Sequence, residues 1–159
     1  MRCKAVKFAF LAFAFLVLTV FASVSEAKTI YVPDDYAKIR WVVNNATDGD
    51  TIIVRDGIYY ENVDVNKQLT LKSENGSAST IVQAAHINDH VFEVTANYVN
   101  ISGFRITGSR GVWGMPGSGI VASGMGLYTA NYCNVSDNIL SENECDIHLG
   151  GEYDYEKRC

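Results

Sequence analysis

Three side chains within one short segment have the chemistry of metal ligands. His86 and His90 are four residues apart, and Asp89 lies between them. Neutral imidazole nitrogens and a carboxylate oxygen bind Cu²⁺ or Zn²⁺. Four-residue spacing places two imidazoles on one face of a helix, but residues 85–90 are expected to form a loop between strands. The three residues are therefore candidate metal ligands, with an ordinary solvated loop as the alternative.

Oxygen ligands for a harder cation gather near the C-terminus. Carboxylate oxygens are ligands that Ca²⁺ prefers, and four acidic residues lie close together there: Asp137, Glu142, Glu144 and Asp146. Their spacing lacks the turn glycine of a calcium-binding loop, which favours a solvated acidic face. The sequence therefore predicts no resident cofactor, and calcium or copper are the alternatives.

Aromatic side chains indicate a second kind of chemistry, the binding of sugars. Aromatic rings offer flat apolar faces on which sugar rings stack, and a tyrosine hydroxyl or a tryptophan N–H adds a hydrogen bond. The candidate carbohydrate-contacting residues lie in or beside expected loops and strand edges: Tyr59, Tyr60, Trp113 and Tyr128. Tyr98 and Tyr132 lie in similar places. The alternative is that several of these rings simply cover strand edges.

Asparagine sequons indicate a modification. The pattern Asn-x-Ser/Thr is the acceptor for N-linked glycans, and it occurs at Asn45, Asn75, Asn100 and Asn134. Each is a glycosylation candidate if the export pathway carries the enzymes. A structural role in a turn or repeat is the alternative for each.

An internal repeat determines which elements position these side chains. Residues 98–107 read YVNISGFRIT, and residues 132–141 read YCNVSDNILS, at a separation of 34 residues. A fixed internal period of this kind is typical of stacked repeat architectures. The units are strand-like, with Gly and Asn between them. The sequence therefore predicts a solenoid of β-strands.

The predicted strands are short and their apolar residues alternate, from Asp50 to Leu149. Residues 51–54 are nearly all apolar, which predicts a strand buried on both sides. The side chains expected to stack inward are Ile53, Val65, Leu71, Val94, Ile101, Ile106, Val135 and Leu140. We therefore predict coils over residues 50–149, with strands of successive coils parallel at about 4.8 Å.

One helix is predicted over residues 34–47, with Asp34 and Asp35 as its N-cap. Its apolar face suits a cover for the open end of the first coil. The tail 150–159 shows no comparable cap: either it is a minimal cap, or the sequence stops early and leaves the end of the last coil open. Exposed strand edges recruit other strands, so association with another copy is expected.

The first 27 residues read as a secretory signal peptide. Arg2, Lys4 and Lys7 form a basic start, Phe8 to Ala22 is apolar, and small residues precede an expected cleavage before Lys28. The apolar run is shorter than the ~20 residues of a spanning helix. The sequence therefore predicts an exported domain over residues 28–159 with no membrane span after cleavage.

Charge and cysteine content limit the partners and the bonding of that domain. The whole chain has 13 Lys and Arg against 18 Asp and Glu, a net charge of −5, which argues against nucleic acid. Cys133, Cys145 and Cys159 are an odd number in an exported domain. One disulfide with a free thiol, an intermolecular bridge, and unpaired buried thiols all remain open.

The segments 29–39, 48–54 and 56–63, together with the 98–107 repeat, resemble right-handed parallel β-helix proteins of the pectin-lyase-like superfamily. The match is best to its NosD-type group of copper-associated and archaeal cell-surface proteins. The resemblance implies an all-β, right-handed, single-stranded parallel β-helix with an N-terminal capping helix. The resemblance is specific for the fold but not for the function, because this fold hosts many activities.

The catalytic motifs of the enzymes in that superfamily do not occur in this sequence. Pectinesterases need Gln-rich oxyanion sites, galacturonases need a Gly-His-Gly, and lyases need an acid trio beside an Arg such as Arg105. We therefore expect a non-enzymatic module, secreted or at the cell surface, that recognises carbohydrate or protein. The alternatives are a remnant of a polysaccharide-active enzyme and a NosD-like copper-handling accessory protein.

Overall fold

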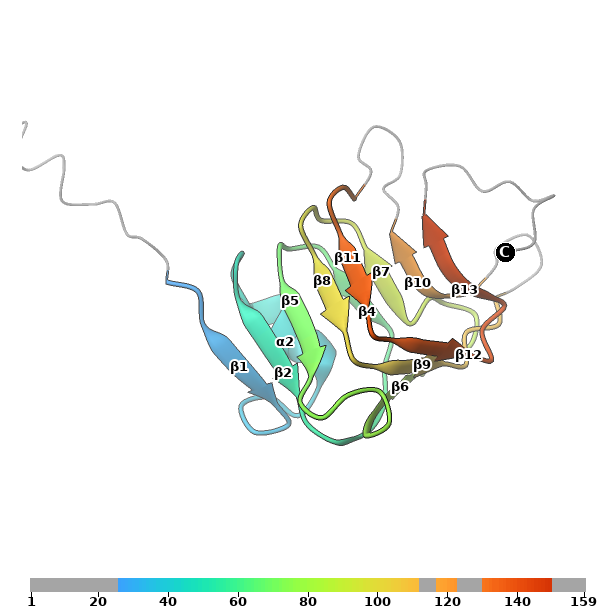
Figure 1. Ribbon diagram of the computed structural model, residues 1–159, viewed down its shortest axis with the longest axis horizontal. Helices are drawn as coiled ribbons and strands as arrows, with labels where there is room; N and C mark the ends of the chain where they lie inside the picture. The colour runs from blue at the N-terminus through green and yellow to red at the C-terminus, as the bar shows by residue number, and fades with distance from the viewer. Residues whose placement is uncertain (1–25, 112–116, 123–129, 150–159) are drawn as a thin grey trace, which may run out of the picture.

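Three parallel β-sheets run side by side along the molecule (Figure 1). The computed structural model describes residues 26–111, 117–122 and 130–149. Sheet A contains, in order, β1 (Thr29–Val32), β2 (Thr51–Val54), β5 (Thr70–Ser73), β8 (Asn100–Ser102) and β11 (Asn134–Ser136). Sheet B contains β3 (Gly57–Tyr60), β6 (Thr80–Gln83), β9 (Arg105–Thr107) and β12 (Ile139–Ser141). Sheet C contains β4 (Val63–Val65), β7 (Phe92–Val94), β10 (Ser118–Ala122) and β13 (Cys145–Leu149).

Each full turn of the chain adds one strand to each sheet. Strands β2, β3 and β4 form one coil, and every third strand afterwards pairs in parallel with the strand of the coil before it. Parallel pairing across a whole chain requires a crossover between neighbouring strands, and here the other two sheets provide it. The molecule is thus a parallel β-helix, which confirms the solenoid of strands predicted from the repeat.

The core is a column of aliphatic side chains inside the three sheets. Its register runs from Ile52 to Leu71 to Ile101 to Val135 along sheet A. Of the predicted core residues, five are fully buried: Val65, Leu71, Val94, Ile101 and Ile106. Val135 and Leu140 are partly buried and pack against the same cluster, because they lie in the last described coil.

The prediction for Ile53 was wrong by one residue. Ile52 and Val54 are the buried members of β2, and Ile53 is only half-buried on the outer face opposite Tyr31 and Lys72. Strand side chains alternate between two faces, so an all-apolar run does not reveal which residues point inward. The strand is therefore buried on one side, not on both.

The 34-residue repeat corresponds to one turn of the solenoid. Asn134 lies opposite Asn100, and Ile139 lies opposite Arg105. Asn138 accepts a hydrogen bond from the backbone N–H of Phe104, 34 residues earlier, and donates to the carbonyl of Ile101. The turn residue Asn138 thus bonds its coil to the coil before it.

The dipeptide Asp56-Gly57 is typical of a turn, but strand β3 begins within it. The strand begins at Gly57 itself, which has φ +153°, a conformation that L residues rarely adopt. The turn residues therefore also open a strand. Its inner side chain is Tyr59, which packs against the core, and its outer ones are Ile58 and Tyr60.

The helix α2 (Ile39–Asn45) is shorter than the predicted 34–47. Asp34 and Asp35 are not its N-cap, because they belong to a separate turn in which Asp35 accepts the Tyr31 N–H. The helix buries three residues in the core and contacts β1 and the edge strand β4. It therefore covers the N-terminal end of the core, where the capping helix was expected. No helix within the described ranges is long and apolar enough to cross a membrane.

Candidate functional site

The turns that enter sheet A stack on one another and form a continuous edge, here called the sheet A entry edge. It consists of residues 47–50, 66–69, 95–99 and 130–133. The backbone N–H of Gly49 donates to the Gln68 carbonyl at 2.7 Å, and that of Tyr98 donates to the Asn131 carbonyl at 3.0 Å. Each turn is therefore held by the next one.

Side-chain oxygens bond the same turns a second time. Asp48 Oδ1 accepts the backbone N–H of Gln68 at 2.9 Å. Asn97 Oδ1 accepts the backbone N–H of Asn131 at 2.8 Å, one repeat later. Because both side chains are exposed, these bonds fix the direction of polar groups that face solvent. The edge is consequently a pre-organised polar surface.

Two exposed tyrosines stack on this edge. The ring centroids of Tyr98 and Tyr132 are 5.1 Å apart and their planes differ by 7°. The two side chains are 52% and 78% exposed. Both residues have φ +57°, a left-handed conformation that costs a bulky L residue free energy. Two strained backbones therefore hold two rings side by side in solvent.

A shallow, open hollow adjoins the first of these rings. It is lined by Asp48, Asn66, Lys67, Gln68, Ala96, Asn97 and Tyr98. The Lys67 ammonium is occupied, because it donates to the carbonyls of Val43, Asn44 and Ala46 at 3.0, 2.8 and 2.8 Å. Within the described ranges, the side-chain amides of Asn66 and Gln68 make no hydrogen bond to protein. The hollow therefore offers amide donors and acceptors, one carboxylate and a ring.

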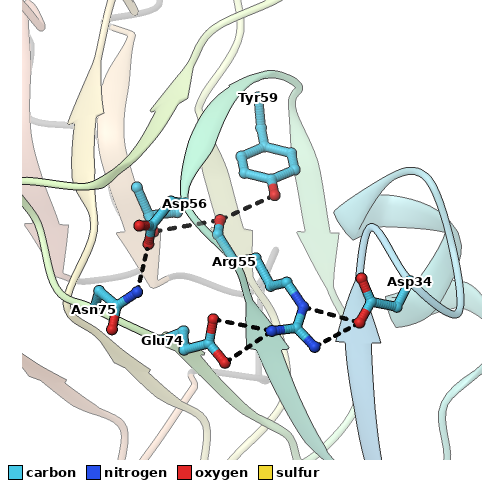
Figure 2. A network of polar contacts seen from close by, with 7 residues as sticks. Asp34, Arg55, Asp56, Tyr59, Glu74 and Asn75 are labelled. Carbon is cyan, nitrogen blue, oxygen red and sulfur yellow. Dashed lines mark hydrogen bonds and ion pairs between the residues drawn. The ribbon is translucent and has the colours of Figure 1, made fainter.

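The predicted sugar-contacting residues of β3 point in opposite directions. The Tyr59 hydroxyl donates to the Arg55 carbonyl at 3.0 Å, and burial raises the pKa of Tyr59 (Figure 2). Tyr60 is 61% exposed on the outer face of sheet B. Tyr59 therefore has a structural bond for its hydroxyl, whereas Tyr60 remains free for contact. Trp113 and Tyr128 lie outside the described residues.

Arg55 links three turns at the same place. Its guanidinium donates to Asp34 at 2.6 and 2.8 Å and to Glu74 at 3.1 and 3.2 Å (Figure 2). Asn75 donates to Asp56 at 2.9 Å beside it. All of these groups are partly or largely exposed, and exposed ion pairs contribute little stability singly. The network orders the surface between sheets A and B and carries no reactive group.

The candidate metal ligands lie in the loop between β6 and β7. His86 is exposed, whereas His90 is half-buried and its Nδ1 accepts the Ser118 N–H at 3.0 Å. Asp89 accepts the backbone N–H of His90 at 2.8 Å. Burial lowers the pKa of His90, and the Asp89 carboxylate acts in the opposite direction. Within the described ranges, no three His, Cys, Asp or Glu side chains are placed to hold a metal ion.

The four acidic residues of the calcium alternative, Asp137, Glu142, Glu144 and Asp146, are exposed. Glu144 Oε2 accepts the Gly117 N–H at 3.4 Å. Asp146 Oδ1 accepts an amide N–H of Asn143 at 3.5 Å. Two of the four side chains thus bond to the protein around them.

The sequons differ in how much of each asparagine the protein already uses. Asn45 donates to the Trp41 carbonyl and Asn75 donates to Asp56, both at the surface. Asn100 donates to Thr70 at 3.3 Å on the outer face of sheet A. Asn134 is exposed directly beside Asn100 in the next coil.

Of the two described cysteines, Cys133 is free and Cys145 is disulfide-bonded.

The fold and this edge define a class of protein: a parallel β-helix whose exposed turns are aligned along one edge. Part of the chain is similar to a protein named cell surface glycoprotein from Methanothermus fervidus, with 34% identity over 123 residues. The match covers 75% of this chain but only 18% of that relative. No family model matches the chain, and no solved structure matches it.

Sequence reasoning noticed Tyr98 and Tyr132 but did not choose them as site residues. The repeat held the necessary signal, since both tyrosines begin their copies and so must lie in adjacent coils. The sequence held no comparable signal for the hollow. Its residues come from three coils of unequal length, and their neighbourhood follows only from the strand register.

Proposed function

We propose that this protein is an exported cell-surface β-helix module that recognises carbohydrate without chemical turnover. The similarity to the cell surface glycoprotein of Methanothermus fervidus and the predicted signal peptide both support a surface or extracellular location. The right-handed, pectin-lyase-like identity suggested by the NosD-type resemblance is part of the same proposal.

The observation that carries the recognition role is the exposed stack of Tyr98 and Tyr132. Exposed aromatic rings in the left-handed region have no evident benefit for folding, because they bury little apolar surface. They do provide a flat, rigid face of the kind on which sugar rings stack. A carbohydrate ligand is therefore favoured over a protein partner, which would need a larger apolar surface.

The proposal is tested by the binding of the secreted chain to envelope polysaccharide. The mature chain is incubated with a purified neutral cell-wall polysaccharide, and the bound fraction is measured by co-sedimentation. Saturable binding with no shortening of the polysaccharide supports a recognition module. Shortening of the polysaccharide during the incubation would favour the enzyme alternative instead, and no binding to any envelope fraction would overturn the proposal.

A further inference from the structure

We propose that the sheet A entry edge is the sugar-binding site and that its ligand is an uncharged glycan chain lying along the solenoid axis. The inference rests on the proposed carbohydrate recognition and assigns it to residues. The proposed site consists of Tyr132, Tyr98, Asn97, Gln68, Asn66 and Asp48. These residues come from four successive coils, so their order along the axis is fixed by the strand register.

The two rings define where the first sugar binds. Each ring of a stacked pair has one face covered by the other, so Tyr98 presents its remaining surface to the hollow that it lines. A pyranose places axial C–H groups on one face, and these groups suit the negative face of a phenol ring. Sugar binding at Tyr98 therefore continues the existing stack by one more ring.

The amides define which sugars fit. The side chains of Asn66 and Gln68 and the Nδ2 of Asn97 each present N–H donors, and the amide oxygens accept hydroxyl protons. Asp48 Oδ1 already accepts a backbone N–H, which leaves Oδ2 as the acceptor for a sugar hydroxyl. Hydroxyl and acetamido groups match this set. In the free protein, water hydrogen-bonds to these amides and to the Asp48 carboxylate, so the empty site lowers the stability of the fold little.

The charges decide against an acidic ligand. Asp48 contributes a negative charge, and the ammonium of Lys67 is held by three helix carbonyls. The whole chain has a net charge of −5. The carboxylates of a uronate polymer would be repelled by Asp48. Among the described residues, the only cation that lines the hollow, Lys67, is already bonded to the helix. The neutral class of hexose or N-acetylhexosamine chains is therefore favoured.

The experiment is an NMR titration of the mature chain with three hexasaccharides: cellohexaose, chitohexaose and hexagalacturonate. We expect the side-chain NH₂ signals of Gln68 and Asn97 to shift with a neutral hexasaccharide, and to shift less with the charged one. Tyr98→Asn removes the ring but keeps a residue that tolerates a left-handed backbone. It should weaken binding by about tenfold, the equivalent of one lost aromatic contact.

Two further variants separate the stacking from other effects. Tyr98→Phe keeps the ring and should bind within about twofold of the unaltered chain, since only a hydroxyl is lost. Tyr60→Ala tests the competing candidate on sheet B by removing its exposed tyrosine, and binding should stay within about twofold if the site is the sheet A entry edge. Circular dichroism on each variant establishes that it is folded.

Each unexpected binding result contradicts a different part of the two proposals. If the chain binds a neutral hexasaccharide but Tyr98→Asn binds equally well, the site assignment is wrong while carbohydrate recognition stands. If Tyr60→Ala abolishes binding, the site lies on sheet B. If hexagalacturonate binds best, the neutral class is wrong. If none of the three sugars or any envelope polysaccharide binds, both proposals fail together.

Discussion

Glu61 and Lys67 hold opposite ends of the capping helix from either side of strand β4. The Glu61 carboxylate accepts the N–H groups of Ile39 and Arg40 at 2.9 and 3.0 Å. The Lys67 ammonium donates to three carbonyls at the other end, at 2.8 to 3.0 Å. A negative charge at the start and a positive charge at the end both complement the helix dipole. One strand thereby fixes the cover of the core.

We expect the two charges to be the main determinants of helix docking. Glu61→Gln replaces one acceptor by a donor facing an N–H, so it should lower the free energy of unfolding by about 1–3 kcal/mol. Lys67→Met should lower it by about 1 kcal/mol, because three carbonyls lose their donor. Urea denaturation measures both.

Lys72→Met and Glu142→Gln are the matched controls. Both residues are exposed and away from the helix, so their substitution should leave the free energy of unfolding within about 0.5 kcal/mol. If Glu61→Gln changes the free energy of unfolding as little as these controls do, helix docking does not depend on the Glu61 carboxylate.

The second prediction concerns the inner face of β2 and β5. Leu71 is fully buried, whereas Ile53 is half-buried on the outer face. Leu71→Ala should therefore cost about 2–5 kcal/mol, as for other large-to-small core substitutions. Ile53→Ala should cost less than half as much. Equal losses in urea denaturation would mean that the outer face of sheet A is covered.

The third prediction concerns a pair of like charges on sheet C. Glu93 lies directly opposite Asp64 on the neighbouring strand. Burial raises the pKa of Glu93, and the carboxylates of Asp64 and Asp89 raise it further. The folded protein therefore holds this proton more tightly than the unfolded chain does. Ionised Glu93 opposes folding at neutral pH, and this opposition is lost as the pH falls from the raised pKa to the ordinary one.

Glu93→Gln should accordingly be more stable than the unaltered protein at pH 7. The advantage should shrink as the pH falls toward the ordinary glutamate value of 4.5. Urea midpoints at several pH values measure the difference, with Glu142→Gln as the control. A constant difference across the range would show that the effect is not caused by ionisation.

The fourth prediction concerns the expected cleavage before Lys28. The backbone N–H of Lys28 donates to Oδ1 of the buried Asp50 at 2.8 Å, and the backbone N–H of Thr47 donates to Oδ2. Burial alone would raise the pKa of Asp50, but the N–H donors of Thr47 and Lys28 outweigh it and lower the pKa. Cleavage would convert the Lys28 amide into an ammonium at the same place.

A chain that begins at Lys28 should therefore be more stable at pH 7 than one that begins at Ala27, by roughly 1 kcal/mol. The gain requires both charges, so it should be lost at alkaline pH, where the α-amino group deprotonates. Thermal unfolding of both chains measures the gain. It should vanish with Asp50→Asn; its persistence there would exclude the pair as the cause.

The fifth prediction concerns association between copies. Within the described ranges, strands β11, β12 and β13 are the last members of their sheets, and Ile139 and Ile147 are 44% and 38% exposed. Edge strands with apolar side chains pair with other chains. We expect self-association that increases with salt, since salt screens the repulsion between acidic copies. Sedimentation at two ionic strengths tests this, and a monomer in both would refute it.

The repeat by itself determined the winding of the chain. Alternating apolar residues and a period of 34 predicted stacked coils, because side chains in strands alternate and each coil must bury its face against the next. The pairing of Ile101 with Val135 followed from the same spacing, because the two residues are 34 positions apart. The coarse fold was therefore predictable from local pattern alone.

Only the tertiary structure decided which face of β2 is inside and where the helix begins. Residues 51–54 are too uniformly apolar to reveal the inner face, and the helix start depends on Glu61, 22 residues beyond Ile39. The sheet A entry edge was decided in the same way. Its residues come from coils of unequal length, so only the hydrogen bonds between coils determine which side chains meet.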